Sequence, residues 1–295
     1  MGRCPTRTRL RGAPIGAARG YGRTVDGKSP LGAYLRARRE LVTPEDAGLP
    51  RGPRRRVPGL RREELALLAG ISPDYYLRLE QGRDHNPSPQ VLDALARVLH
   101  LDPDGTRYLH ELARADAPAG RLPRTEERVP PGVAQLIDGL DVPTFVQGRF
   151  LDVLAANAAA RALSPQYRPG VNLLRAVFLD PADRDLHQDW DRATEEAVAG
   201  LRAGTLADLD DPRLTDLVAE LSAQSARFRT LWDRQDVRWK VGGTSRLLHP
   251  VVGPLELRHE KFGVTGADGQ LMVMYHADPG SPSHQALRRL VATAV

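Results

Sequence analysis

The sequence has a single cysteine, Cys4, among its 295 residues. One cysteine excludes an internal disulfide framework and a zinc site built from cysteines. The sequence also lacks an apolar run long enough to span a membrane, and its first residues lack the apolar core of a secretory signal peptide. We therefore expect a cytoplasmic protein without a membrane partner.

Spacings typical of catalytic or metal sites are missing as well. The eight histidines include no HExxH pair, and His259 and Glu260 are neighbours in a strand pattern, so they point to opposite faces. The three aspartates of residues 208–211 lack the glycine and the terminal glutamate of a calcium loop. Ser281 is not placed between glycines as the nucleophile of a hydrolase elbow would be. The sequence predicts no catalytic residue, no metal and no cofactor, and hence a protein that is not an enzyme.

Positive charge is concentrated at the start of the chain. Residues 1–62 contain 16 Lys and Arg against 4 Asp and Glu, a net charge of +12, although the whole chain carries only +5. Residues 1–128 have a net charge of +8, and residues 129–295 have one of −3. A basic segment can be a simple solvated arm. Beside a DNA-reading motif, however, it supplies the groups that neutralise phosphates.

The stretch that follows this basic segment has the pattern of a helix-turn-helix. Apolar residues recur at helical spacing over residues 62–69, and Gly70 then accepts the left-handed backbone that ends a helix. Ser72 and Pro73 form the start of a second helix, which ends at Gly82. The connection is as short as this motif needs. An ordinary helical hairpin with a solvated outer face is the alternative.

One face of the second helix carries polar side chains that suit the major groove of double-stranded DNA. Asp74, Arg78 and Gln81 share that face because of their helical spacing. Arginine can bind guanine through two hydrogen bonds, and a carboxylate can accept one from cytosine. We predict base-edge contacts from Asp74, Tyr75 and Arg78. The predicted phosphate contacts, which set the register on the duplex, are Arg61, Arg62, Ser72, Arg83 and Asn86.

Composition divides the chain into four segments. Residues 1–28 consist largely of Arg, Gly, Pro and Thr without periodicity and are predicted to be a disordered basic arm. Residues 29–116 are predicted to form the DNA-binding domain, residues 117–131 a linker with many prolines, and residues 132–295 a second domain. Besides the helix-turn-helix, the helical patterns of the first domain cover residues 31–41 and 88–99 and a stretch from residue 102 onward.

The second domain mixes strand and helix patterns. Apolar and polar residues alternate over residues 142–154 in the pattern of a strand, a turn and a second strand. Two long helical patterns follow at 183–201 and 211–234. Strand patterns separated by glycines come next, and a helix over residues 283–295 ends the chain. These strand patterns cover residues 237–241, 244–249, 253–262 and 270–276. This order indicates an α+β domain with helices on one face of an antiparallel sheet.

Four motifs in the first domain resemble the Xre or λ-repressor type of helix-turn-helix. They are Arg-Arg-Glu-Glu at 61–64, Gly-Ile-Ser at 70–72, Asp-Tyr-Tyr at 74–76 and Leu-Glu-Gln-Gly-Arg at 79–83. Together they resemble one bacterial branch, the MmyB-like transcription regulators. Segments 249–255 and 277–283 of the second domain are similar to the same family, so the resemblance covers residues 30–295.

This resemblance implies a PAS-like ligand-binding domain behind the DNA-binding domain. The predicted fold class is therefore multidomain, with an all-α helix-turn-helix N-terminal domain and an α+β PAS-like C-terminal domain. Two residues depart from the pattern of many relatives: Gln235 stands where a histidine is frequent, and Ser245 where a lysine is common. If either position contacts the ligand in relatives, the ligand of this chain would differ.

Aromatic residues of the second domain are candidates for the wall of a ligand pocket. Phe228 and Trp232 are four residues apart and share a helix face. Core packing is the simpler explanation of such residues, whereas the alternative is an apolar pocket, which aromatic side chains commonly line. The family resemblance implies a small apolar or fatty-acid-like effector. The candidate pocket residues are Trp190, Phe228, Trp232 and Trp239.

We therefore expect a bacterial sequence-specific transcription regulator controlled by a small apolar effector. It should bind DNA as a homodimer, because one helix-turn-helix unit buries little surface and this motif pairs across half-sites. Two alternatives remain for the second domain. It could be a module that binds a protein partner, or an enzyme that the helix-turn-helix only localises, although the missing catalytic spacing argues against the latter.

Overall fold

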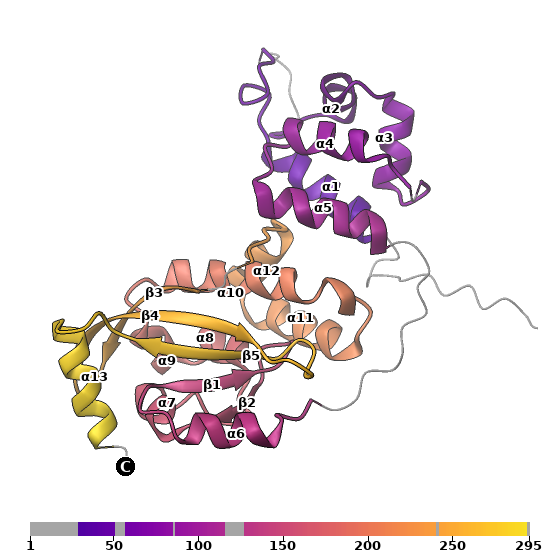
Figure 1. Ribbon diagram of the computed structural model, residues 1–295. Helices are drawn as coiled ribbons and strands as arrows, with labels where there is room; N and C mark the ends of the chain where they lie inside the picture. Colours follow the sequence, from indigo (N-terminus) through magenta and orange to yellow (C-terminus); the bar gives the residue numbers. More distant parts are fainter. Residues whose placement is uncertain (1–28, 51–56, 85, 116–126, 240–241, 294–295) are drawn as a thin grey trace, which may run out of the picture.

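The computed structural model describes residues 29–50, 57–84, 86–115, 127–239 and 242–293. The predicted basic arm and most of the predicted linker lie outside these ranges. Figure 1 shows an all-helical first domain and a second domain in which helices pack on an antiparallel sheet. The predicted fold class, all-α followed by α+β, is therefore confirmed. Within the described ranges, no helix has both the length and the apolar character that crossing a membrane requires.

Serine–proline pairs begin three helices of the first domain. Ser29, Ser72 and Ser88 each accept a hydrogen bond from the backbone N–H three residues further on, and a proline follows each of them, where its missing N–H costs nothing. Gly70 ends the second helix with a φ of 70°. The helices of this domain are α1 (Pro30–Leu41), α2 (Arg62–Ala69), α3 (Pro73–Glu80), α4 (Pro89–Val98) and α5 (Pro103–Ala115).

Apolar side chains of all these helices meet in one core. Tyr34 of α1, Tyr76 of α3 and Tyr108 of α5 are each at most 1% exposed. Leu65 of α2 and Leu79 of α3 are completely buried in the same core. Because α3 turns these residues inward, its opposite face is left to the solvent.

The described strands of the second domain form one antiparallel sheet in the order β2-β1-β5-β4-β3. Phe145 lies opposite Val273, and Leu247 lies opposite Leu255, so apolar residues of four strands meet on one face. Helices α7 (Ala158–Leu163), α9 (Pro181–Leu186) and α13 (Pro282–Ala292) contact the strands of this sheet. The strands are β1 (Thr144–Gln147), β2 (Val153–Ala156), β3 (Gly242–His249), β4 (Gly253–Gly263) and β5 (Leu271–His276).

A separate helical layer with its own apolar core lies beside the sheet (Figure 1). Phe228 and Leu221 at its centre are completely buried, and Phe150 from the β1–β2 turn is 2% exposed. Helix α6 (Pro131–Asp138) lies outside this layer and packs on β2. The layer consists of α8 (Leu173–Leu179), α10 (Trp190–Gly204), the short helix η1 (Leu206–Asp208), α11 (Pro212–Gln224) and α12 (Ala226–Asp233).

The first long helical pattern, residues 183–201, is not one helix. Helix α9 ends at Leu186 and α10 begins at Trp190. Between them, His187 forms a β-bridge with Leu247, and Gln188 N donates a hydrogen bond to Arg246 O at 3.0 Å. The break therefore supplies a partner for backbone groups of the edge strand β3, which would otherwise be unpaired.

The second long helical pattern, residues 211–234, divides at Ser225. Its side chain accepts a hydrogen bond from Phe228 N at 3.2 Å and so starts α12 as a new helix. The strand predicted over 237–241 is also wrong for the described residues 237–239, which form no strand. Val237 is instead buried in the core of the first domain, because the connector after α12 packs against that domain.

Candidate nucleic-acid interface

Helix α3 presents its polar residues to the solvent. Tyr76 and Leu79 on its inner face are completely buried, whereas Asp74 and Arg78 on its outer face are exposed and Tyr75 is half-buried. The Arg78 guanidinium lies 5.6 Å from the centre of the Tyr75 ring. The three residues predicted to contact bases thus share one accessible side of the helix.

A buried ion-pair cluster holds the C-terminal end of α3. The Glu80 carboxylate lies 2.7 Å from Arg39 Nε of α1 and 2.6 Å from Arg62 Nε of α2. Arg39 also donates a hydrogen bond to Leu60 O at 2.7 Å. Burial opposes ionisation of Glu80, but the hydrogen bonds from both arginines hold its pKa below the usual value. The cluster therefore ties α1, α2 and α3 together in one arrangement.

The residues predicted to contact phosphates surround α3. Ser72 is exposed, and its Oγ accepts a hydrogen bond from Tyr75 N at 3.1 Å, so it also caps the helix. The Arg62 side chain remains 44% exposed despite its ion pair with Glu80. The other predicted phosphate residues, Arg61, Arg83 and Asn86, are exposed.

A hollow of about 400 Å³ lies between α1 and the turn that follows α3. Three arginines line it with one carboxylate, Glu80, which Arg39 already neutralises. Such a positively charged hollow suits a phosphate group. Arg36 is the residue that sequence reasoning missed here; its position four residues after Gly32 on the same helix face was the available signal. The lining residues are Gly32, Ala33, Arg36, Arg62, Glu80, Gln81 and Arg83.

Three of the four predicted pocket residues come together in the helical layer of the second domain. Phe228 stacks on Trp232 with ring centres 5.8 Å apart. Phe178 of α8 contacts Phe228 edge-on at 5.2 Å and Trp190 at 6.4 Å. Trp190 Nε1 donates a hydrogen bond to Val177 O at 2.8 Å. We call Phe178, Trp190, Phe228 and Trp232 the aromatic cluster.

The fourth predicted pocket residue, Trp239, lies against the first domain. The Arg107 guanidinium of α5 is 3.6 Å from the centre of its ring, and the ring of Tyr108 is 6.1 Å away. The backbone N of Trp239 donates a hydrogen bond to Asp104 Oδ2 at 3.0 Å. The structure thus places Trp239 at the boundary between the domains and outside the aromatic cluster.

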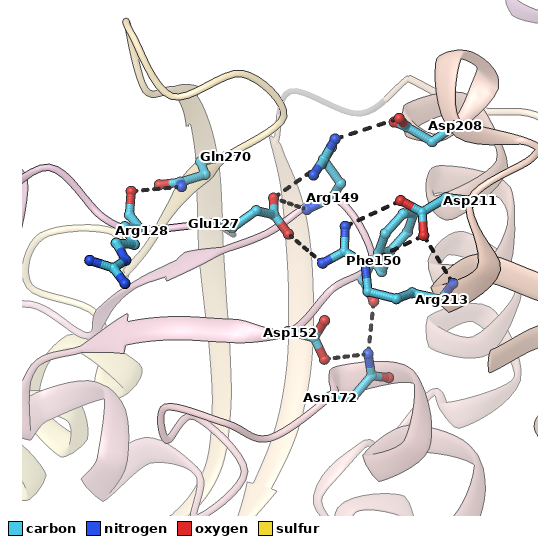
Figure 2. Close-up of polar contacts among 10 residues, drawn as sticks. All are labelled: Glu127, Arg128, Arg149, Phe150, Asp152, Asn172, Asp208, Asp211, Arg213 and Gln270. Carbon is cyan, nitrogen blue, oxygen red and sulfur yellow. Dashed lines mark hydrogen bonds and ion pairs between the residues drawn. The ribbon is translucent and has the colours of Figure 1, made fainter. Parts of the chain in front are cut away.

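A polar group centred on the buried Arg149 holds the end of the predicted linker against the second domain (Figure 2). Arg149 lies 3.3 Å from Glu127 Oε1 and 3.5 Å from Asp208 Oδ1. Arg213 pairs with Asp211 at 3.2 Å and lies 4.0 Å from Glu127 Oε2. With two arginines against three carboxylates, this group does not attract an anion. Its geometry instead holds Glu127 against Arg149 of the β1–β2 turn and Arg213 of α11 (Figure 2).

Comparison with known families assigns both halves of the chain. Residues 129–290 match the MmyB-like transcription regulator ligand binding domain, which alone spans more than half of the sequence. The chain belongs to the MmyB-like transcription regulators. Residues 30–109 match a helix-turn-helix domain. No curated protein matches the chain.

As an MmyB-like regulator, the protein combines a DNA-binding domain with a ligand-binding domain, as its sequence motifs indicated. Both matched families are of the regulatory type. The two departures from the family pattern lie at separate places. Gln235 follows α12, and its Oε1 accepts a hydrogen bond from Arg202 at 2.5 Å. Ser245 Oγ lies 3.2 Å from His259 Nδ1 on the sheet.

Proposed function

We propose that this regulator reads duplex DNA in a sequence-specific manner through the outer face of α3. Asp74, Tyr75 and Arg78 contact base edges in the major groove, where arginine recognises guanine and a carboxylate accepts from cytosine. The observation that carries this proposal is the exposed polar face of α3 beside a hollow with three arginines. Phosphates bound around that face orient the helix on the duplex.

The phosphate contacts come from residues on three sides of α3. Arg62, Arg83 and Arg36 line the hollow. Arg36 Nε and Arg62 Nε already donate to Glu40 and Glu80, so these two arginines offer a phosphate their remaining N–H groups. Arg61, Ser72 and Asn86 are exposed next to them. Such contacts carry no sequence information, so their loss weakens binding to every duplex alike.

The regulator binds DNA as a homodimer in this proposal. A single helix-turn-helix domain buries too little surface for tight specific binding, and this motif reads two half-sites about one helical turn apart. Selection from a random duplex pool with the full chain, followed by footprinting, tests both points. We expect a repeated half-site. A single unrepeated site bound by a monomer overturns the dimer, and a pool without sequence enrichment overturns specific reading.

A small apolar or fatty-acid-like effector binds next to the aromatic cluster in this proposal. The support is chemical: aromatic and aliphatic side chains of α8, α10, α11 and α12 gather there, which is the usual lining of apolar ligand sites. The chain contains three tryptophans. Trp232 belongs to this cluster, whereas Trp239 lies at the domain boundary, so the two report on different places.

Tryptophan fluorescence during titration with dodecanoate and hexadecanoate tests the effector. We expect a fluorescence change that is reduced in Trp232→Phe, where Trp190 remains as the second tryptophan of the cluster, and retained in Trp239→Phe, which is the matched control. A change that depends on Trp239 alone would overturn the proposed place of binding.

A protein-binding role of the second domain is the other candidate function. It is favoured by apolar residues at the β3–β4 turn, where Leu248 is 50% and Val251 78% exposed. If neither acid changes fluorescence, melting temperature or DNA binding, this candidate replaces the effector proposal.

A further inference from the structure

The two domains share an apolar core. Val237 and Ala203 of the second domain are 8% and 6% exposed and belong to the same buried cluster as Tyr34 and Tyr108 of the first. Figure 1 shows the connector that follows α12 rising to α1 and α5. A covalent linker alone would leave two separate cores, so this packing joins the domains in a defined orientation.

Polar contacts between the two domains fix the orientation in which they pack. Arg38 Nη1 of α1 lies 2.6 Å from Asp236 Oδ1, and Asp104 Oδ2 of α5 accepts the backbone N–H of Trp239 at 3.0 Å. The Arg107 guanidinium covers the Trp239 ring. Because α3 lies at the flank of the first domain, apart from the connector, these contacts leave the recognition face uncovered (Figure 1).

Arg202 of α10 lies at the centre of this boundary. It is 3% exposed and donates hydrogen bonds to Gln235 Oε1 at 2.5 Å and Trp232 O at 2.6 Å. Its guanidinium also interacts with the hydroxyl of Tyr108 in the first domain. Among the described residues, its Nε has no hydrogen-bond partner. The groups that hydrogen-bond this buried guanidinium are neutral, and the carboxylate of Asp236, which favours its charge electrostatically, pairs with Arg38 instead. The guanidinium is therefore sensitive to small movements of its neutral partners.

The side chain of Trp232 reaches both this boundary and the aromatic cluster. Arg202 stacks on the Trp232 ring at 3.9 Å, and the same ring stacks on Phe228 with an interplanar angle of 12°. A change in the aromatic cluster that moves Trp232 therefore changes both the stacking of Arg202 and one of its hydrogen bonds. Arg202 also interacts with Tyr108 of α5 in the first domain.

We infer that Arg202 is the positioning residue that couples the aromatic cluster to the orientation of the DNA-binding domain. The inference rests on the proposed function, because it describes how the proposed effector site changes DNA binding. A ligand that moves Trp232 loosens the docking at Val237 and Trp239. In a dimer, docking sets the direction and separation of the two recognition helices, so its loss alters affinity without touching α3.

The docking itself is tested in the full chain without DNA or effector. Arg202→Met removes the hydrogen bonds and the stacking cation, and Trp239→Ala removes only the boundary ring. Arg229→Met is the control, because Arg229 is exposed on α12 and donates to Ser222 O within its own domain. We expect one calorimetric transition for the natural chain and the control. Both boundary variants should show two transitions and a larger radius of gyration by X-ray scattering.

A natural chain that unfolds in two independent transitions would overturn the docking. So would boundary variants that keep the single transition and the radius of the control. If Arg202→Met does not fold, Trp239→Ala decides the question, because Trp239 lies outside the described helices and strands and is only half-buried.

Coupling is measured as the ratio of DNA dissociation constants with and without dodecanoate, using the duplex selected above. Allosteric coupling typically changes affinity by about 5–150-fold. We expect a change of this size in the natural chain and in Arg229→Met, and a ratio near one in both boundary variants. Retention of the full ratio in Arg202→Met and Trp239→Ala would overturn the inference. A natural chain that docks but does not respond to dodecanoate would overturn the effector proposal and leave the docking result standing.

Discussion

Arg39 in the DNA-binding domain and Arg202 in the ligand-binding domain are both buried, at 7% and 3% exposure, but their surroundings differ. Arg39 faces the carboxylate of Glu80, and that partner outweighs desolvation and raises the pKa of Arg39. Arg202 faces an amide, a carbonyl and the ring of Trp232, and burial lowers its pKa. The first setting pairs the charge directly with a carboxylate, whereas in the second the hydrogen-bond partners are neutral and Asp236 acts on the charge only electrostatically.

This difference indicates different roles for the two regions. A guanidinium paired with a buried carboxylate holds its elements in one arrangement, because separating the pair leaves two uncompensated charges. A guanidinium held by neutral groups can change partners at lower cost. The recognition helix is therefore built on a rigid cluster, whereas the boundary between the domains is built on an adjustable one.

Glu80→Ala is expected to have the largest effect, because it leaves Arg39 buried without its carboxylate. Breaking a buried pair in this way costs about 3–5 kcal/mol of unfolding free energy. Urea unfolding followed by circular dichroism measures it. Glu63→Ala on the exposed side of α2 is the control and should cost no more than about 0.5 kcal/mol. An equal loss of unfolding free energy in the two variants would show that the ion pair between Glu80 and Arg39 does not hold the helices rigidly.

Asp183 extends the comparison to a buried carboxylate without a guanidinium. Burial and then the nearby Asp180 raise its pKa to about 6 from 3.8. His187 Nε2 lies 3.6 Å away, and burial lowers the pKa of that imidazole. Because the folded state holds the proton of Asp183 more tightly than the unfolded chain, its stabilising contribution is complete below pH 3.8 and is lost as the pH rises through about 6.

Asp183→Asn should remove that pH dependence. The difference in unfolding free energy between the variant and the natural chain should grow by about 2–3 kcal/mol from acidic to neutral pH, in favour of the variant. Denaturant unfolding at a series of pH values measures it, and taking the difference cancels the titration of groups distant from Asp183. A difference that does not vary with pH would assign Asp183 an ordinary pKa.

Arg78 and Arg83, unlike Arg39 and Arg202, are exposed, so replacing them with alanine should affect DNA binding rather than folding. Arg78→Ala should cost about 1–3 kcal/mol on the selected site and relax discrimination at one base pair. Arg83→Ala should weaken selected and random duplexes alike and reduce the salt slope by about one. Gel-shift titrations over a salt series distinguish the two. Equal loss on selected and random DNA for Arg78→Ala would remove it from base reading.

The smallest effect on stability is expected for Arg202→Met. Replacing a buried charge with an apolar side chain of similar volume is often neutral, because the desolvation cost disappears together with the hydrogen bonds. Apart from the loss of docking itself, the unfolding free energy of each domain should change by no more than about 1 kcal/mol. Calorimetry provides the value. A loss as large as that of Glu80→Ala would make the two arginines equivalent and cancel the distinction between a rigid and an adjustable cluster.

Local patterns predicted the first domain well. The serine–proline starts at Ser29, Ser72 and Ser88 and the helix end at Gly70 depend on neighbouring residues only, so the sequence is sufficient to identify them. The exposed face of α3 followed from helical periodicity. The partners of Glu80 could not be predicted, because Arg39 lies far from it along the chain and meets it only after packing.

The second domain was less predictable for the same reason. Residues 183–201 have the periodicity of one helix, but the need of edge strand β3 for a backbone partner interrupts it at His187. Trp239 is an aromatic residue of the kind that lines apolar pockets, but the packing of the connector on α5 determines where it lies. In each case a contact between segments distant in the sequence overrides the structure that the local pattern predicts.

Local sequence patterns are sufficient to identify the helix-turn-helix, the side of α3 that faces away from the core, the α+β order of the second domain and the family. These features depend on local capping, on the periodicity of apolar residues and on motifs of neighbouring residues. Tertiary structure alone decided which charges are paired, which aromatic residues meet and that Val237 joins the core of the other domain. Such contacts depend on burial, and burial is a property of the packed chain rather than of any stretch within it.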